Sequence, residues 1–546
     1  MTSVQSSHAS TSTAHLETSP ASPHEATEHA PTGTAKRSSD DALTGNLAKR
    51  AKGGSSDAAS TLQAHTRFFE DGSTTTTGSR VPSRVPIAER AGHIAAALRG
   101  RQIDAVTHAS SKEALAHASK TTLGGWTSDS HFHPTQYTQQ GILPEEMLAM
   151  MDKVGVYRSV IMPIPTDVIP CGHPDNNHIP AEDYYVPKED MSMARHELTA
   201  ERENKIAKSA HLVVNQQVDA DTAQFMDMSG LTDAQRDRLD PMVTGLHLGS
   251  PLSSEALLKK LHKDPGTFTG VGEVTIHKEL VERQFDGARQ ANLTDNVKPF
   301  KDMVATAGVI GMPVVMHCDV DSTENQRKNG LGSPQHLDGV KKLLASPEVK
   351  NTTMIWAHFG GIGRFVAKPD NHMENLREIL KDPEMRHVHV DISWSRVARQ
   401  IVMKPNAQGV EEPDPASIEA AAKLITEFPD RFLMGSDALD PKKEETWAET
   451  GNMYKPLLDK LAPEVRQKVT IGNYERVIVG ARAKVRAFEK HVLTNEFMKK
   501  NVRPSGPTPL RDGPHIEPEK LRAARDAAFA AAGVDERGEP VSNAAH

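Results

Sequence analysis

The chain contains 546 residues, and its 64 Lys and Arg residues stand against 72 Asp and Glu residues, which gives a formal net charge of −8. That balance argues against wholesale nucleic-acid binding. The two cysteines, Cys171 and Cys318, are too few for a disulfide framework. No run of about 18 apolar residues occurs, nor does a charged segment followed by an apolar core at the N-terminus, so we expect neither a membrane span nor a classical signal peptide.

Residues 1–85 form a leader rich in Ser, Thr, Ala, His and Pro. The leader contains few large apolar side chains, and their burial would not offset the entropy lost on ordering the backbone. We therefore expect the leader to be disordered. Two basic clusters in it, Lys36-Arg37 and residues 49–52, resemble a bipartite nuclear localisation signal, and the alternative is two solvated clusters in a flexible tail.

The leader also resembles, in composition, the Ser/Thr-rich export leaders of bacterial type III effectors. In the first place, we expect a cytoplasmic protein. The alternative is export by a signal-peptide-independent route into a host cell or its nucleus, where host proteins or the nuclear import machinery would be partners.

From residue 126 to about residue 500, apolar runs rich in β-branched residues alternate with helical patterns. The runs cover residues 124–127, 158–163, 242–247, 268–274, 311–317, 353–358, 388–394 and 431–437. This alternation predicts an α/β fold in which helices cover a parallel sheet. Eight such units predict a (β/α)8 TIM barrel, whose chemistry lies at the carboxyl ends of its strands.

Three further segments surround or interrupt the expected barrel. Residues 86–125 read as a helical lead-in. Residues 166–208 form an insertion that we expect to be a lid or specificity loop, with a surface excursion as the alternative. Residues 501–546 read as a linker followed by an Ala-rich helix over 518–532, which begins with Pro518 and precedes Gly533.

Candidate metal ligands stand at the ends of several runs. On a strand, residues i and i+2 point to the same side, so His131 and His133 would present two imidazoles to one point. Neutral imidazole nitrogens are favoured ligands of divalent transition metals. Later runs end at or near Glu273, His317, His358 and Asp437.

The order His-x-His on the first strand, His on the fifth, His on the sixth and Asp on the eighth resembles the metal-dependent amidohydrolase superfamily. The stretches His358-Phe359-Gly360-Gly361, residues 428–437 and Gly472-Asn473-Tyr474-Glu475-Arg476 resemble the branch that includes aminocarboxymuconate-semialdehyde decarboxylase and related carboxylate hydrolases. The resemblance covers about residues 125–485. It implies one divalent cation, zinc before other metals, held by His131, His133, His317 and Asp437.

By the same resemblance, Asp437 would accept a proton from water at the cation, and His358 would polarise the substrate oxygen or carry a proton. Glu273 could bridge to a second metal, or it could instead pair with His277 or with a lysine in the barrel. Arg364, Trp394 and His247 are candidates for binding an anionic, planar substrate, because an Arg fork suits a carboxylate. The alternative for these residues is packing or surface ion pairing.

We therefore expect an enzyme that hydrolyses an amide, ester or lactone bond in a small, carboxylated molecule. Non-oxidative decarboxylation with the same metal site is the alternative within enzymes. A delivered effector that uses the barrel as a scaffold for binding a host protein is the alternative from another class. The sequence is also compatible with a homo-oligomer. The partner that we expect for the enzyme is a small-molecule substrate.

Overall fold

The structure is a computed structural model, and it describes residues 119–541 apart from 138, 140, 171–197, 229, 286–292, 294–296 and 504–515. The chain divides into two units, residues Met1–Thr77 and Gly78–His546. All of the described residues belong to the second unit. The expected disordered leader, its basic clusters and most of the 86–125 lead-in lie outside the described residues.

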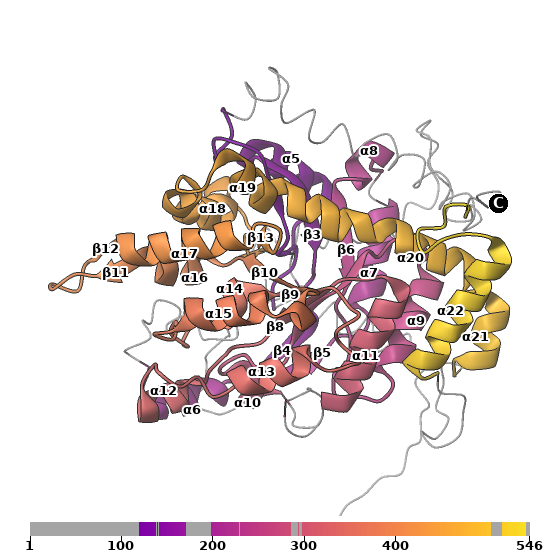
Figure 1. Cartoon of the computed structure of the whole chain (residues 1–546), viewed down its shortest axis with the longest axis horizontal. Coiled ribbons are helices and arrows are strands. Elements are labelled where there is room, and N and C mark those ends of the chain that lie inside the picture. Colours follow the sequence, from indigo (N-terminus) through magenta and orange to yellow (C-terminus); the bar gives the residue numbers. More distant parts are fainter. Residues whose placement is uncertain are drawn as a thin grey trace, which may run out of the picture. The chain divides into compact units, whose positions relative to one another are not determined.

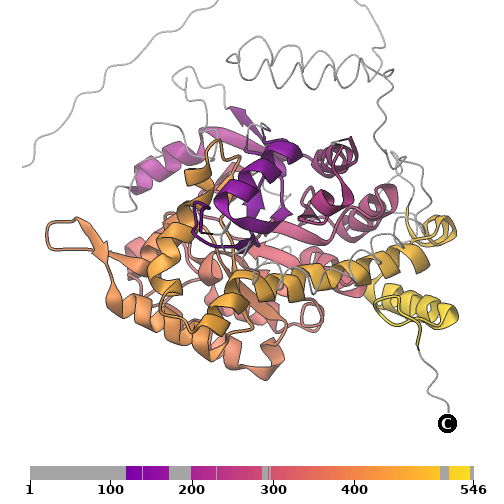
Figure 2. The same ribbon diagram turned by 90° about the horizontal axis from the view of Figure 1, so that it is seen from above.

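Eight parallel strands form the barrel (Figures 1 and 2). In sheet order they are β1 (Thr127–Asp129), β3 (Val156–Ile161), β6 (Leu239–Val243), β7 (Gly270–Thr275), β8 (Val314–His317), β9 (Met354–Trp356), β10 (Val388–Ile392) and β13 (Phe432–Met434). Neighbours in the sheet are also successive along the chain, as in a (β/α)8 barrel. The predicted TIM barrel is confirmed.

The first and last strands meet and close the barrel. The Ser130 amide donates to the Met434 carbonyl at 2.9 Å, and the Asp437 amide donates to the His131 carbonyl at 2.7 Å. Just beyond these bonds, β2 (Phe132–His133) pairs in parallel with β14 (Ala438–Leu439). Closure therefore places the His-x-His segment directly beside Asp437.

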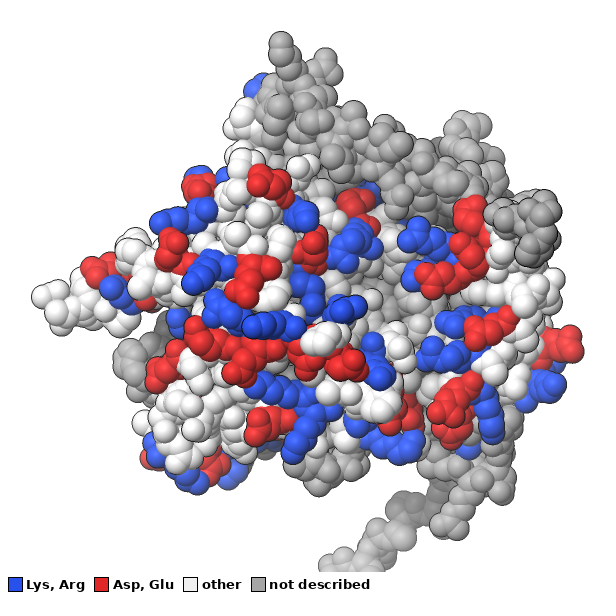
Figure 3. Space-filling view, viewed as in Figure 1, with Lys and Arg blue, Asp and Glu red and all other residues white. Residues whose placement is uncertain are grey.

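Helices surround the strands in Figure 1. The main ones are α5 (Pro144–Val154), α9 (Ser253–Lys263), α11 (Val297–Ile310), α13 (Leu337–Leu344), α15 (His372–Lys381), α16 (Ser395–Val402), α17 (Pro415–Glu427), α18 (Glu444–Leu458) and α20 (Gly480–His491). Figure 3 shows Lys and Arg side chains interspersed with Asp and Glu over this face. Ion pairs such as Arg377–Glu427, at 2.9 Å, join neighbouring outer helices.

Shorter elements fill the connections between these helices and strands. They are α7 (Val218–Met228), α8 (Asp233–Arg236), α10 (Val281–Gln284), α12 (Thr323–Asn329), α14 (Ala357–Gly361), η3 (Pro383–Met385), the antiparallel pair β11 (Met403–Pro405) and β12 (Glu411–Pro413), α19 (Pro463–Gln467), η4 (Lys468–Gly472), η5 (Glu475–Val479) and α21 (Asn495–Asn501). Among the described residues, no helix combines the length and apolar character needed to cross a bilayer.

Side chains alternate between two apolar regions along the strands. Val315, Ile355 and Leu433 belong to a cluster inside the barrel, while their chain neighbours pack outward against the helices. Residues 477–479 and Tyr474 join the inner cluster from the C-terminal helices. A residue two positions further along a strand points to the same side. Such residues at the carboxyl ends of the strands therefore face the barrel mouth.

The third strand begins and ends earlier than the sequence indicates. The apolar run predicts a strand over 242–247, whereas β6 spans Leu239–Val243. The chain leaves the sheet there because the amides of Thr244 and Gly245 donate to the buried Asp219 carboxylate, at 2.8 and 3.0 Å, instead of to a neighbouring strand. His247 therefore lies in the loop after the strand.

The insertion over 166–208 contains regular structure at its base. β4 (Thr166–Pro170) pairs antiparallel with β5 (Ala210–Val214), and α6 (Ala200–Ala207) precedes β5. Residues 171–197, which include Cys171 and the expected substrate-contacting loop, lie outside the described residues.

The C-terminal helix α22 (Pro518–Ala532) has the bounds that its sequence predicts. Gly533 follows with φ 65°, the left-handed conformation in which glycine ends a helix without strain. The helix docks on the barrel's own helices: Leu521 is fully buried, and Arg525 donates to the Val309 carbonyl of α11 at 3.1 Å. Figure 2 shows the long helix α20 reaching the same group of C-terminal helices.

Candidate metal centre

Six of the residues singled out in the sequence lie at the carboxyl ends of the barrel strands. His131 and His133 follow β1, Glu273 lies in β7, His317 ends β8, His358 follows β9 and Asp437 follows β13. All of these except Asp437 are buried. Two compact groups of ligand atoms result, His131–Glu273–His358 and His131–His133–Asp437, and they share His131.

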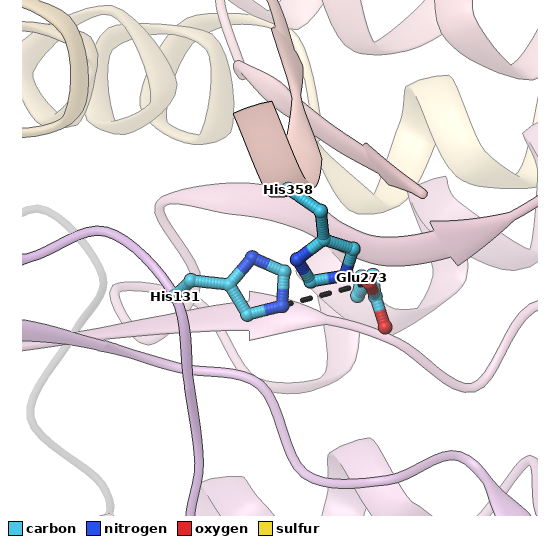
Figure 4. Close-up of side chains that lie close together, drawn as sticks. All are labelled: His131, Glu273 and His358. Carbon is cyan, nitrogen blue, oxygen red and sulfur yellow. Dashed lines mark hydrogen bonds and ion pairs between the residues drawn. The ribbon is translucent and has the colours of Figure 1, made fainter. Parts of the chain in front are cut away.

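Glu273 occupies the middle of the first group. Its Oε1 lies 2.9 Å from Nδ1 of His317, 3.2 Å from Nε2 of His358 and 3.5 Å from Nε2 of His131. Figure 4 shows the His131 and His358 rings pointing toward this carboxylate. One carboxylate oxygen is therefore shared by imidazoles from three different strands.

The second group joins His133 to Asp437. Nδ1 of His133 donates to the Met162 carbonyl at 2.7 Å, so in the neutral ring Nε2 carries the lone pair. That Nε2 lies 3.1 Å from Oδ1 of Asp437, which is also an acceptor. Two acceptors at this separation repel each other unless a proton or a cation lies between them.

Asp391 and Ser393 orient two of the histidines. Nδ1 of His131 donates to Oδ2 of Asp391 at 2.9 Å, and the His358 amide donates to Oδ1 at 2.9 Å. Ser393 donates its hydroxyl hydrogen to Asp391 and accepts from Nδ1 of His358 at 2.9 Å. In their neutral forms both rings consequently present Nε2 with its lone pair toward the cluster, as ligating histidines do when a carboxylate or hydroxyl binds the other nitrogen.

His317 differs from the other histidines. Nδ1 contacts Glu273, and Nε2 lies 3.0 Å from Oδ1 of the buried Asp319. Burial raises the pKa of Asp319 to about 8 and lowers the pKa of His317. A protonated Asp319 would donate to Nε2 while Nδ1 donates to Glu273, so in this arrangement His317 supports Glu273. Its expected role as a direct ligand stays a prediction.

Three residues at the barrel mouth have left-handed backbone conformations. His358 has φ 61°, Asp437 has φ 53° and Trp394 has φ 71°. Residues other than glycine adopt this conformation at a cost of roughly 1–2 kcal/mol, and such strain gathers at functional sites. The three residues follow the ends of β9, β10 and β13, where the chain leaves the sheet.

The electrostatics of the cluster favour added positive charge. Burial disfavours the imidazolium of His131, yet Asp391, Asp437 and Glu273 outweigh that effect and raise its pKa to about 10. Burial would raise the pKa of Asp437, but the surrounding histidines lower it to about 2. Lys278 and His317 keep the pKa of Glu273 well below its usual range in spite of burial. Both carboxylates therefore stay ionised.

The donor set fits a divalent cation. Nε2 of His131 is fully buried and makes no hydrogen bond among the described residues, although Glu273 and Asp437 oxygens lie 3.5 Å from it. A buried polar atom without a hydrogen bond is rare and calls for an explanation. Imidazole nitrogens combined with carboxylate oxygens are the ligands of zinc and similar metals.

The three expected substrate-binding residues lie in different settings. Trp394 is part of the cluster wall, with its ring centroid 5.0 Å from that of His358 and 6.4 Å from that of His317. Arg364 is buried and lies over the Phe365 ring at 5.0 Å. The His247 carbonyl accepts hydrogen bonds from the Ser253 hydroxyl at the start of α9 and from the Ser250 amide. Substrate binding by these residues stays a prediction.

Five residues at this site were not predicted from the sequence: Asp391, Ser393, Asp319, Lys278 and Tyr137. The run Val388-His389-Val390-Asp391-Ile392-Ser393 carries a signal for the first two, because its polar residues alternate with apolar ones and so share the inner face. Lys278 and Tyr137 stand in loops after strands, where spacing predicts no direction for a side chain.

No family model matches the chain, and no curated protein matches it. Solved structures do match at low identity. A probable 2-pyrone-4,6-dicarboxylic acid hydrolase from Acinetobacter baumannii is 11% identical over 65% of this chain and 99% of its own, with a TM-score of 0.33. 2,6-Dihydroxybenzoate decarboxylase is 13% identical over 62% and 88%, with a TM-score of 0.35. A dihydroorotase from Campylobacter jejuni is 13% identical over 64% and 82%, with a TM-score of 0.33. The names of these three proteins thus include a hydrolase and a decarboxylase.

Proposed function

We propose that this protein is a metal-dependent hydrolase that cleaves an amide, ester or lactone bond in a small, carboxylated molecule. The observation that carries the proposal is the contact of 3.1 Å between Nε2 of His133 and Oδ1 of Asp437. The Met162 carbonyl fixes the proton of His133 on Nδ1, so the two facing atoms are both acceptors. A cation between them, shared with the unbonded Nε2 of His131, resolves that conflict.

His131, His133 and Asp437 would hold the cation, and the Glu273 carboxylate lies 3.5 Å from Nε2 of His131. A bound divalent cation supplies Lewis acidity and a water nucleophile at neutral pH. Asp437 would accept the proton of the attacking water, since its carboxylate stays ionised and follows the end of β13. Its backbone is held by the hydrogen bond to the His131 carbonyl, which limits its movement during proton transfer.

His358 would act on the opposite side of the cluster. Its Nδ1 proton is committed to Ser393, so Nε2 is free of hydrogen and lies 3.2 Å from Glu273. Burial lowers the pKa of His358, which keeps the ring neutral. A neutral imidazole at this place can accept a proton and return it to the leaving group.

The proposal is tested by elemental analysis of protein purified without chelators. We expect about one tightly bound divalent ion per chain, with zinc as the first candidate. Less than ~0.2 ion per chain after incubation with metal salts would overturn the proposal. A value near two would make Glu273 a bridging ligand.

A substrate screen then separates the two reaction classes. Lactones, N-acyl amino acids and aromatic carboxylates are incubated with the metal-loaded protein, and products are analysed together with released carbon dioxide. Hydrolysis products without carbon dioxide support the proposal, whereas carbon dioxide release from an aromatic carboxylate would replace it with the decarboxylase alternative.

A further inference from the structure

A buried lysine stands beside the candidate metal centre. Lys278 follows β7, and only 7% of its surface is exposed. Its Nζ lies 3.6 Å from Oε2 of Glu273 and 5.9 Å from the centroid of the Trp394 ring. The Tyr137 hydroxyl, from the loop after β2, forms a hydrogen bond with the same ammonium. Three different barrel loops thus place an ammonium, a hydroxyl and an indole together.

The ion pair between Lys278 and Glu273 is long for a charge-assisted hydrogen bond. A charge-assisted N–H···O bond usually measures about 2.7–2.9 Å, and the Lys278–Glu273 contact is longer, at 3.6 Å. Glu273 also directs its other oxygen to three imidazoles. An ammonium has three donors, and burial makes each unsatisfied one costly.

A cation at the centre would weaken that ion pair further. Glu273 would then share its negative charge with the cation, and the neighbouring Asp437 would do the same. Of the acidic groups that act on Lys278, Glu279 would then remain, and an added anion would help to balance the buried positive charge. The cation–π contact with Trp394 keeps the ammonium at this place without neutralising it.

We propose that Lys278 and Tyr137 bind the carboxylate of the substrate, and so select small carboxylates over neutral analogues. The inference rests on the proposed function, because it supplies the substrate class of the same site. The ammonium would make a charge-assisted hydrogen bond to one carboxylate oxygen, and the Tyr137 hydroxyl would donate to the carboxylate as well. The substrate carboxylate would then lie beside Glu273 and the Trp394 ring, which both contact Lys278.

The test is a calorimetric titration of zinc-loaded protein with benzoate and, separately, with the neutral benzamide. We expect the wild type to bind benzoate more tightly. Lys278→Met should weaken benzoate binding by about tenfold or more while benzamide binding stays unchanged. Tyr137→Phe should weaken benzoate binding by a smaller factor, and Lys278→Arg should retain most of the preference.

Lys260→Met is the matched control. Lys260 is also largely buried and paired with a carboxylate, Asp219 at 2.8 Å, but it lies on α9. It should leave the affinities for both ligands unchanged. Zinc content should be equal or higher in Lys278→Met, because removal of a positive charge next to Glu273 favours the cation.

Zinc content is measured in every sample, so the two proposals fail in different ways. A wild-type chain that holds no ion overturns the proposed function. A chain that holds the ion but loses no benzoate affinity on Lys278→Met overturns the assignment of Lys278. Equal losses for benzoate and benzamide also overturn it, since they would show a structural role. Thermal unfolding identifies any variant that does not fold, and Lys278→Arg and Tyr137→Phe then decide the question.

Discussion

Nδ1 of His131 donates a hydrogen bond of 2.9 Å to Oδ2 of Asp391, a residue 260 positions later in the chain. The bond selects the tautomer of His131, so that Nε2 presents its lone pair to Glu273 and Asp437. The other oxygen of the same carboxylate accepts from the His358 amide and from Ser393. One buried carboxylate on β10 therefore sets the orientation of the two histidines that follow β1 and β9.

Asp391→Asn should weaken metal binding by about 10–100-fold, because a carboxamide neither carries the charge nor ensures that His131 keeps its proton on Nδ1. The affinity is measured by competition with a chromophoric chelator. Asp338→Asn, on the exposed start of α13, serves as the control and should change nothing. Equal affinity in Asp391→Asn and the wild type would contradict the orienting role.

Ser393→Ala should lower turnover by about 10–100-fold and leave the ion content close to that of the wild type. The reason is that Ser393 is the acceptor for Nδ1 of His358. Without it the His358 ring is free to rotate, while the His131–His133–Asp437 group stays intact. Loss of the ion together with activity would show that His358 is a ligand.

Asp437→Asn should reduce turnover by the ~10²–10⁴ typical of a lost general base, while metal binding weakens only moderately. The amide keeps the shape and one oxygen donor but has almost no basicity. Rates are measured on a substrate found by the screen, with ion content determined on the same sample. A variant that binds metal and turns over at the wild-type rate would refute the mechanism. If every screen fails, and wild type and variant behave identically in cells, the scaffold hypothesis gains.

Deletion of residues 1–80 should leave thermal unfolding and ion content unchanged. This segment contains almost no large apolar side chains, so we expect it to add nothing to the core. Differential scanning calorimetry of the full chain and the truncated chain measures the difference. Insolubility of the truncated chain, or a midpoint several degrees lower, would show that the domain boundary lies elsewhere.

Leu521→Ala should lower the free energy of unfolding by about 2–5 kcal/mol, the range for a large-to-small change at a fully buried position. The residue belongs to α22, which packs against α11, so its loss leaves a cavity between the two helices. Chemical denaturation provides the measurement. Lys520→Ala, on the exposed side of the same helix, should stay within about 0.5 kcal/mol of the wild type. Similar values for the two variants would mean that α22 contributes little to the core.

The sequence by itself determined the barrel and the positions of its ligand candidates. Alternation of apolar runs with helical patterns is a local property, and it predicts the order of strands and helices directly. The bounds of α22 follow equally from Pro518 and Gly533, because capping depends on neighbouring residues alone. The i and i+2 spacing of His131 and His133 likewise predicts their common direction.

The tertiary structure decided how the candidates are connected. Which residue of β10 lies opposite His131 depends on the register of strands far apart in the sequence and on closure between β1 and β13. The end of β6 depends on Asp219, whose carboxylate receives the amides of Thr244 and Gly245. Lys278 lies in a loop after a strand, where its direction follows from packing against Trp394. Local spacing shows which face a residue occupies, whereas only the closed barrel shows what it faces across the mouth.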